Sequence, residues 1–511
     1  MNDRRRLGIR RLVSLAALAA SALLAVSTVA PMSAQAAADG WWHTSGSRIV
    51  AADGSTVTIK AANWFGLETP NCAPHGLWSI TLDEGLAQIA AMGFNTVRLP
   101  YSNQCLAAST TSSIDASRNP DLVSLTPLQL MDAVIAKARA HGLRVILDRH
   151  RIESSGQSKL WYTSTYSEKR WIDDWVMLAN RYRDDPTVVG ADLHNEPHGS
   201  ACWGCGDTSR DWWAAATRAG NAVLAANPRL LIIVDGVERQ NDASTTWWGG
   251  GLKDAGAEPV VLATPNRVVY SPHEYPASVY GQSWFSAPNY PANLPSVWEA
   301  NWGYLARTGS APIFVGEFGT KLETTSDAQW LRALVSYLGT NGLSFGYWSF
   351  NPNSGDTGGL VADDGKTPQT AKLAALAPLL AGGSATPMPS PSASATWTPS
   401  PTPTPTSLPS PGSAPVSATW MLQSAWQDGY VAEFSVSASR AVGGWTISWS
   451  SPGATQVVNA WGMTCAVASG TITCTGKDWA GPLAAGQSVR VGLQVAATAA
   501  PSSPRLTVTT N

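Results

Sequence analysis

The chain has 511 residues, a formal net charge of −2 and only 14% charged residues. A nucleic-acid-binding protein would carry a basic patch, so this near-neutral balance argues against nucleic acid as a partner. The length allows one large domain and a smaller one, and 24 Trp against 8 Phe indicate more flat, exposed aromatic surface than a core alone needs.

The first 38 residues resemble an export signal. Five arginines lie between positions 4 and 11, followed by an apolar stretch from Leu12 to about Val29 and the small-x-small pattern Ala34-Gln35-Ala36. This order is typical of a cleaved signal peptide, here 1–38. A membrane anchor is the alternative, but a cleavage pattern follows and no other segment approaches 18 uninterrupted apolar residues. We expect a secreted, extracellular protein with no membrane segment after cleavage; Arg10-Arg11 leaves the twin-arginine route open beside Sec.

Residues 39–381 alternate strand-like and helix-like patterns. Apolar residues at helical spacing predict helices over Thr126–His141, Ser167–Arg183 and Ser209–Ala226. Strands alternating with helices predict an α/β fold, the (β/α)8 or TIM barrel. An open doubly wound sheet is the alternative, but it would carry a glycine-rich phosphate loop where this chain has Asn63-Trp64-Phe65-Gly66. The expected strands are Val57–Asn63, Thr96–Tyr101, Arg144–His150, Val188–Asn195, Leu230–Asp235, Val268–His273, Ile313–Glu317 and Phe345–Phe350.

The composition changes near Gly382. No charged residue occurs between Leu373 and Gln427, and Ser384–Pro415 is almost entirely Ser, Thr, Pro and Ala. Such a segment cannot bury a core, so 382–415 is predicted to be an extended Pro/Ser/Thr-rich linker. Residues 416–511 show short alternating strands and no helical pattern, which indicates a C-terminal all-β sandwich.

Two predicted strands bring a glutamate to their carboxyl ends. Asn195 and Glu196 follow the apolar run that starts at Val188, and Glu317 ends the run that starts at Ile313. The carboxyl ends of barrel strands are where side chains perform chemistry. A pair of carboxyl groups suits cleavage of a glycosidic bond, with one as acid and the other as nucleophile or base. Either glutamate alone would equally well be a salt-bridged structural residue, but the pair favours catalysis.

Other polar and aromatic side chains also fall at predicted strand ends or in the loops that follow. They are Arg98, His150, Asn195, His273, Tyr275 and Trp348, with the segments 63–66, 202–205 and 351–359. In this order, with the two glutamates, they closely resemble glycoside hydrolase family 5, particularly bacterial secreted endoglucanases. The resemblance covers residues 41–380.

The resemblance implies a role for each strand-end residue. Glu196 would be the acid/base and must stay protonated, which requires an apolar or negatively charged surrounding. Glu317 would be the nucleophile and must be ionised, with Arg98 and Tyr275 beside it to favour the charged form. The reaction would then retain the anomeric configuration.

The remaining residues would bind and orient the substrate. Asn195 would hold the 2-hydroxyl of the sugar, a contact that strengthens in the transition state. His150 and His273 would orient the catalytic groups, and Trp348 would form the floor under the reacting sugar, although alone each would more often be structural. Weaker candidates for stacking on further sugars are Trp78, Trp247 and Trp248.

The C-terminal segment resembles the family 2 carbohydrate-binding modules. The matching tryptophans imply a flat strip for crystalline cellulose formed by Trp426, Trp461 and Trp479, while Trp445 fits the core. One departure stands out: that family ties its two ends with a disulfide, whereas this chain has Cys465 and Cys474 inside the module.

Six cysteines in an exported chain predict disulfides rather than a metal site. Cys202 and Cys205 would be half of a zinc site, but no second half follows, so a local disulfide is expected. Cys465–Cys474 would link neighbouring strands. Cys72 would pair with Cys105, because loops after adjacent strands lie side by side; similar endoglucanases use the loop after His150, where this chain has Glu153-Ser154-Ser155. We expect no metal and no cofactor.

The sequence therefore predicts a secreted, retaining endo-β-1,4-glucanase, a monomer that is anchored to cellulose or a related β-1,4-glucan. Another β-1,4-glycan such as mannan, xylan or xyloglucan is the alternative substrate, since family 5 shares its catalytic residues across several. The alternative from another class is a non-catalytic glycan-binding protein, against which the intact Glu196 and Glu317 count.

Overall fold

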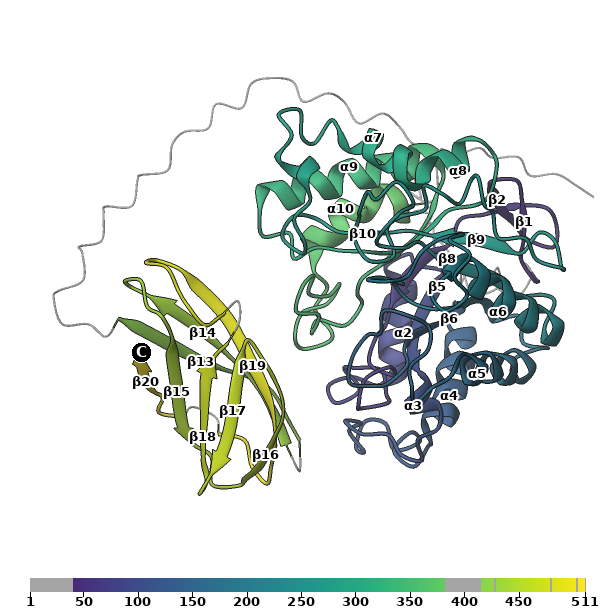
Figure 1. Ribbon diagram of the computed structural model, residues 1–511. Coiled ribbons are helices and arrows are strands. Elements are labelled where there is room, and N and C mark those ends of the chain that lie inside the picture. The colour runs from purple at the N-terminus through teal and green to yellow at the C-terminus, as the bar shows by residue number, and fades with distance from the viewer. Residues whose placement is uncertain (1–39, 382–414, 427–428, 478–479, 502–503, 511) are drawn as a thin grey trace, which may run out of the picture. The chain divides into compact units, whose positions relative to one another are not determined.

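The computed structural model divides the chain into two units, a mixed α/β unit followed by an all-β unit (Figure 1). The described residues are 40–381, 415–426, 429–477, 480–501 and 504–510. The predicted signal peptide 1–38 and nearly all of the predicted linker 382–415 lie outside them, so both stay predictions. Within the described residues, no helix is long and apolar enough to cross a membrane.

The first unit is built on a nine-stranded sheet whose neighbouring strands pair in parallel, in the order β10-β11-β12-β4-β5-β6-β7-β8-β9. β9 and β10 are separated only by Pro272, which has no N–H to continue the ladder. A bridge between Tyr270 and Ile313 joins β9 to the start of the β11 segment and closes the sheet. The predicted barrel is confirmed. Its strands are β4 (Lys60–Asn63), β5 (Thr96–Ser102), β6 (Arg144–Arg151), β7 (Val188–Asp192), β8 (Leu231–Asp235), β9 (Val268–Ser271), β10 (His273–Glu274), β11 (Phe314–Phe318) and β12 (Ser344–Tyr347).

The first predicted strand, Val57–Asn63, is two strands in the structure. Residues 56–57 form β3, which belongs to a small antiparallel sheet with β1 (His43–Ser45) and β2 (Arg48–Val50), and only β4 joins the barrel. Trp42 and Ile49 from this N-terminal segment pack against barrel residues such as Ile146 and Phe314 in one apolar cluster. The N-terminal segment therefore contributes to the core of the barrel.

Helices begin where polar side chains cap them. Thr126 and Gln129 form a capping box, and the predicted helix from Thr126 is α4. The helix predicted from Ser209 starts later, at Trp212, because Asp211 caps it and accepts from the backbone N–H of Ala214. The helices are α2 (Leu82–Ala91), α3 (Asn103–Leu106), α4 (Pro127–Ala140), α5 (Glu168–Arg181), α6 (Trp212–Ala226), α7 (Leu294–Trp298), α8 (Tyr304–Arg307), α9 (Thr325–Asn341) and α10 (Thr370–Leu380), with the short 3₁₀ and π segments η2 (Ser283–Ser286) and η3 (Glu299–Gly303).

Many tryptophans of the barrel unit are buried, so the expectation that the excess marks exposed faces is wrong for them. Trp171 and Trp175 on α5 both donate from Nε1 to the backbone oxygen of Leu193, at 2.9 and 3.1 Å. Trp212 on α6 donates to the backbone oxygen of Asp235 at 2.9 Å. These indoles fill the layer between helices and sheet and find partners at the ends of β7 and β8. Fully buried tryptophans in this unit include Trp64, Trp161, Trp171, Trp175, Trp203, Trp212, Trp298, Trp302 and Trp330.

The second unit is the predicted all-β fold, with two four-stranded sheets in the orders β13-β14-β19-β16 and β17-β18-β15-β20. Phe434 and Val491 from one sheet share a core with Ile447 and Ile472 from the other. Trp445 lies in this core, as expected, and is fully buried. The strands are β13 (Val416–Trp426), β14 (Gly429–Ala438), β15 (Trp445–Ser450), β16 (Ala454–Trp461), β17 (Met463–Ala468), β18 (Thr471–Gly476), β19 (Ser488–Ala497) and β20 (Thr507–Thr510).

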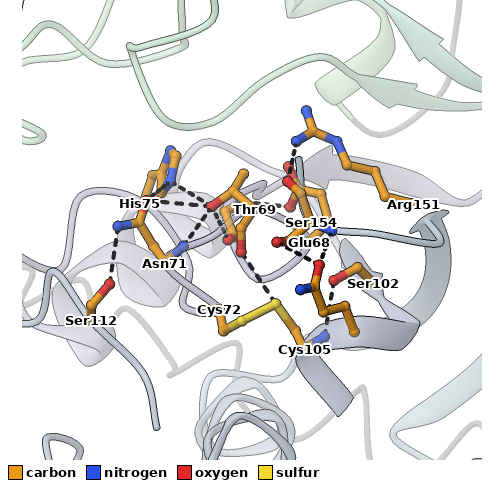
Figure 2. Close-up of a disulfide and its surroundings, with 12 residues drawn as sticks. Glu68, Thr69, Asn71, Cys72, His75, Ser102, Cys105, Ser112, Arg151 and Ser154 are labelled. Atoms are coloured by element: carbon orange, nitrogen blue, oxygen red, sulfur yellow. Dashed lines mark hydrogen bonds between the residues drawn. A yellow bond between two sulfur atoms is a disulfide. The ribbon is translucent and has the colours of Figure 1, made fainter. Parts of the chain in front are cut away.

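Three disulfides join the six cysteines in the pairs that the sequence suggests. Cys465–Cys474 links β17 to β18, and Cys72–Cys105 links the loop after β4 to α3 (Figure 2). The loop after β6 has no cysteine, and Ser154 there donates from its N–H and its hydroxyl to Oε1 of Gln104, at 2.7 and 2.9 Å. α3 thus holds both neighbouring loops, one by a disulfide and one by hydrogen bonds.

Candidate active site

The strand-end residues meet at the carboxyl end of the barrel. Arg98 extends from β5, His150 from β6, His273 from β10 and Glu317 from β11. Glu196 follows β7, which ends at Asp192 rather than at Asn195 as the sequence suggested. All these residues are buried. The structure brings together side chains from strands far apart in the sequence, and the two glutamates lie among them.

Glu317 is held by a cation and a hydroxyl. Arg98 donates from its NH1 group to Oε1 of Glu317 at 2.6 Å, and the Tyr275 hydroxyl donates to Oε2 at 2.7 Å. Burial alone would lower the pKa of Arg98, but the negative charges of Asp148, Asp192 and Glu317 raise it well above its usual value. The guanidinium therefore stays charged where it contacts Glu317.

Arg98 also organises the rest of the site. Its Nε donates to Oδ2 of Asp192 at 2.8 Å, and its NH2 group donates to Oδ1 of Asn195 at 2.9 Å. NH1 further contacts Oδ1 of Asn63 at 3.0 Å and Oδ2 of Asp148 at 3.1 Å. One rigid planar group thus fixes Glu317 and Asn195 with respect to each other.

Glu196 has a different environment. Oε1 of Glu196 lies 2.9 Å from Nδ1 of His273, and the backbone N–H of Glu196 donates to Oδ2 of Asp235 at 3.0 Å. Burial raises the pKa of the Glu196 carboxyl to about 8, although the charge of Arg98 opposes this. The backbone of Glu196 is left-handed, with φ 52°, which is uncommon for a residue other than glycine. Glu196 is therefore a carboxyl that keeps its proton near neutral pH.

The two carboxyl groups are close. One carboxylate oxygen of Glu196, one ring nitrogen of His273 and one carboxylate oxygen of Glu317 all lie within 4.8 Å of one another. A second such group is Asp148, His150 and Glu317. Groups of this kind resemble metal ligands, but the Arg98 guanidinium already occupies the charged side of Glu317 and Asp148. Two carboxyl groups with different hydrogen-bond partners thus lie side by side in this cluster.

Both histidines are neutral at ordinary pH. Burial lowers the pKa of His150 to about 3 and that of His273 to about 4. Nδ1 of His150 lies 2.7 Å from Oδ2 of Asp148 and 3.7 Å from Oε1 of Glu317. The two imidazoles thus orient carboxyl groups without adding positive charge near Glu196 or Glu317.

Trp348 follows β12 and lies beside the catalytic groups. Its ring stacks with Phe65 at 5.3 Å between centroids and with His150 at 5.1 Å. Phe65 contacts His75, which contacts Trp78 at 5.4 Å. A row of rings therefore runs from Trp348 to Trp78, and Figure 2 shows that His75 of this row lies on the loop held by Cys72–Cys105.

The other two stacking candidates differ from each other. Trp248 is 43% exposed and its ring lies on His198, with centroids 3.8 Å apart. Trp247 is only 6% exposed and packs edge-on against Trp284 and Phe285. Trp247 therefore has little exposed surface, and its role in stacking on a sugar stays a prediction.

Family models match both units. The cellulase model, glycosyl hydrolase family 5, matches residues 50–354, and the cellulose binding domain model matches residues 416–511. The first match covers more than half of the chain. The chain belongs to glycosyl hydrolase family 5. It is a glycoside hydrolase with a C-terminal cellulose binding domain.

Individual relatives of this family 5 hydrolase span most of its length. An endoglucanase of Paenibacillus polymyxa is 54% identical over 343 residues, which cover 66% of this chain and 86% of the relative. The major extracellular endoglucanase of Xanthomonas campestris is 41% identical over 454 residues, which cover 87% of this chain and 92% of the relative. The solved catalytic domain of the Xanthomonas enzyme superposes with a TM-score of 0.63 at 42% identity, over 66% of this chain and 99% of that structure. The structure of a hyperthermophilic endocellulase of the archaeon Pyrococcus horikoshii superposes with a TM-score of 0.64 at 37% identity, over 67% of this chain and 99% of that structure.

Several residues of the family 5 site were missed by sequence reasoning. Asp148, Asp192 and Asp235 all lie within the site and are fully buried. Each ends an apolar run at the carboxyl end of a predicted strand, which was the available signal. The predicted cellulose strip is a different case, because Trp479 and the side chains of Trp426 and Trp461 lie outside the described residues.

Proposed function

We propose that the chain is a secreted, retaining endo-β-1,4-glucanase that cleaves internal bonds of cellulose. The observation that carries this proposal is the contrast between two carboxyl groups with oxygens within 4.8 Å of each other: burial raises the pKa of Glu196, whereas Glu317 accepts hydrogen bonds from Arg98 and Tyr275. Retaining enzymes place their carboxyl groups about 5–5.5 Å apart, which leaves no room for a water between them.

The proposed reaction has two displacements. The Glu317 carboxylate attacks C1 of the sugar while Glu196 gives its proton to the departing glycosidic oxygen. A water then attacks C1 of the glycosyl-enzyme, and Glu196 takes a proton from it, so Glu317 leaves as a carboxylate and both residues are restored. Nδ2 of Asn195 has no hydrogen-bond partner among the described residues, which suits a contact with the 2-hydroxyl.

The aromatic row supports an extended substrate. Trp348, next to His150, would carry the reacting sugar, while Trp78 and the exposed ring of Trp248 would carry others. Sugars stack on flat aromatic faces, and an enzyme that cuts inside a chain needs several such contacts. Release of reducing ends from carboxymethylcellulose, mannan, xylan and xyloglucan would rank the substrates, and a preference for mannan or xylan would overturn the choice of cellulose.

The C-terminal unit would hold the enzyme on its substrate. We assign this role to Trp426, Trp461 and Trp479, on the family match and on the predicted linker. An extended linker would let an anchored barrel reach many bonds and would raise its local concentration. Export is supported by the predicted signal peptide and by a relative named as extracellular.

Trapping tests the nucleophile directly. A 2-deoxy-2-fluoro cellobioside with an activated leaving group should form a glycosyl-enzyme that turns over slowly. Peptide mass spectrometry should then find the label on Glu317. A label on another residue, or no covalent species with an active enzyme, would contradict the assignment.

A further inference from the structure

Asp235 ends β8, is fully buried, and has no role in the reaction proposed above. Its Oδ2 accepts the backbone N–H of Glu196 at 3.0 Å. The same oxygen lies 3.4 Å from Nε2 of His273, whose Nδ1 lies 2.9 Å from Oε1 of Glu196. This oxygen of Asp235 thus binds the backbone of Glu196 directly and lies near the imidazole that contacts the Glu196 side chain, without a hydrogen bond to Nε2 of His273 among the described residues.

The conformation of Glu196 requires such support. Its φ of 52° is sterically unfavourable for a side chain with a Cβ, and such a residue keeps this conformation only when its surroundings impose it. Behind it, a Cβ on Gly249 would lie 3.2 Å from Cγ of Glu196, and the N–H of Gly236 donates to the oxygen of Gly249 at 3.1 Å. The end of β8 therefore also supports the loop that packs on Glu196.

The neighbouring buried aspartates contact Arg98 instead of Glu196. Asp148 and Asp192 contact Arg98 at 3.1 and 2.8 Å. Among the described residues, Asp235 has no salt bridge within 4.0 Å to that guanidinium; its close polar contacts are the Glu196 N–H and His273. The three buried strand-end aspartates are thus divided between the two catalytic groups.

We propose that Asp235 is a positioning residue for the acid/base carboxyl, holding Glu196 where its proton meets the glycosidic oxygen. This role rests on the proposed function of Glu196. Proton transfer requires the two oxygens at hydrogen-bond distance, and a misplacement of about 1 Å costs on the order of 100-fold in rate. Asp235 contributes a fixed acceptor and transfers no proton itself.

The test uses two substrates that differ in their need for an acid. Cleavage of cellotetraose expels a sugar alkoxide unless the leaving oxygen is protonated, whereas cleavage of 2,4-dinitrophenyl β-cellobioside expels a stable phenolate without a proton. Asp235→Ala should lower kcat/KM about 100-fold on cellotetraose and less than about fivefold on the aryl cellobioside. Asp235→Asn keeps the accepting oxygen and should recover most of the loss. Asp235→Leu carries the same test if the alanine variant does not fold.

Two further variants make the outcomes distinguishable. Asp184→Asn makes the same change of side chain at a position that is 90% exposed and should leave both rates unchanged. Glu196→Gln should also lower kcat/KM more on cellotetraose than on the aryl cellobioside, and the difference should be larger than for Asp235→Ala. If Glu196→Gln lowers both rates equally, the proposed acid/base role is wrong. If Glu196→Gln discriminates but Asp235→Ala does not, only the positioning role of Asp235 is overturned.

Discussion

The barrel and the C-terminal unit use side chains for function in opposite ways. In the barrel, Arg98 alone contacts five polar side chains, and the proposed catalytic groups are buried in a hydrogen-bonded network. In the cellulose strip that we propose for the module, each tryptophan ring would instead stack on the ligand independently. A connected network fails as a whole when one member changes, whereas independent contacts are lost one at a time. The predictions below test this difference, starting with the largest effect.

Loss of the nucleophile should abolish turnover on every substrate. Glu317→Gln should lower kcat about 10⁴-fold or more, because no covalent intermediate can form. Binding to crystalline cellulose should not change, since the module is intact. Initial rates on carboxymethylcellulose and a pull-down on microcrystalline cellulose measure the two properties. Glu323→Gln, at an exposed position on the loop after β11, is the matched control and should behave as wild type.

Removal of the module should weaken binding to crystalline cellulose without affecting hydrolysis of a soluble substrate. Truncation after Gly382 should leave hydrolysis of carboxymethylcellulose nearly unchanged but reduce binding to crystalline cellulose about 100-fold, because the tethered anchor is lost. Single replacements of Trp426, Trp461 and Trp479 by alanine should give graded losses, and the triple variant should match the truncation. Equal loss on soluble and crystalline substrates would mean that the module supports the barrel instead of anchoring it.

The acid should set the alkaline limit of activity. Burial raises the pKa of Glu196 to about 8, so the carboxyl is protonated below pH 8 and loses its proton above it. The kcat/KM for cellotetraose should therefore fall about tenfold per pH unit above pH 8. The dinitrophenyl cellobioside should not show this limb. A limb of equal slope with both substrates would indicate titration of another group.

The smallest effect on activity should come from the Cys72–Cys105 disulfide. The double variant Cys72→Ser/Cys105→Ser loses a crosslink between residues 33 apart, which costs about 3–4 kcal/mol in the chain-entropy description. The melting temperature should fall, while kcat/KM at 25 °C should stay within about twofold, since Ser154 and Gln104 still hold the neighbouring loop to α3. Calorimetry with and without the substitutions measures the shift. An unchanged melting temperature would refute a stabilising role.

The sequence predicted the barrel and the two glutamates because buried parallel strands are apolar runs and their ends carry the chemistry. It did not predict that Asp148, Asp192 and Asp235 form a network, because apolar runs show where a strand ends and not which side chains meet. The interpretation of the tryptophan excess as exposed aromatic surface is wrong for much of the barrel unit. Many of these indoles are buried, and their N–H groups bind backbone oxygens such as that of Leu193, a pairing that only the fold reveals.

If Glu196 and Glu317 act as acid/base and nucleophile in a double displacement, the anomeric configuration of the product must be retained. The most direct measurement is proton NMR of the first product released from a cello-oligosaccharide, recorded before the anomers equilibrate. The account predicts that the new reducing end appears as the β anomer, because two inversions at C1 restore the starting configuration. An α anomer as the first product would show a single inversion and would contradict the account.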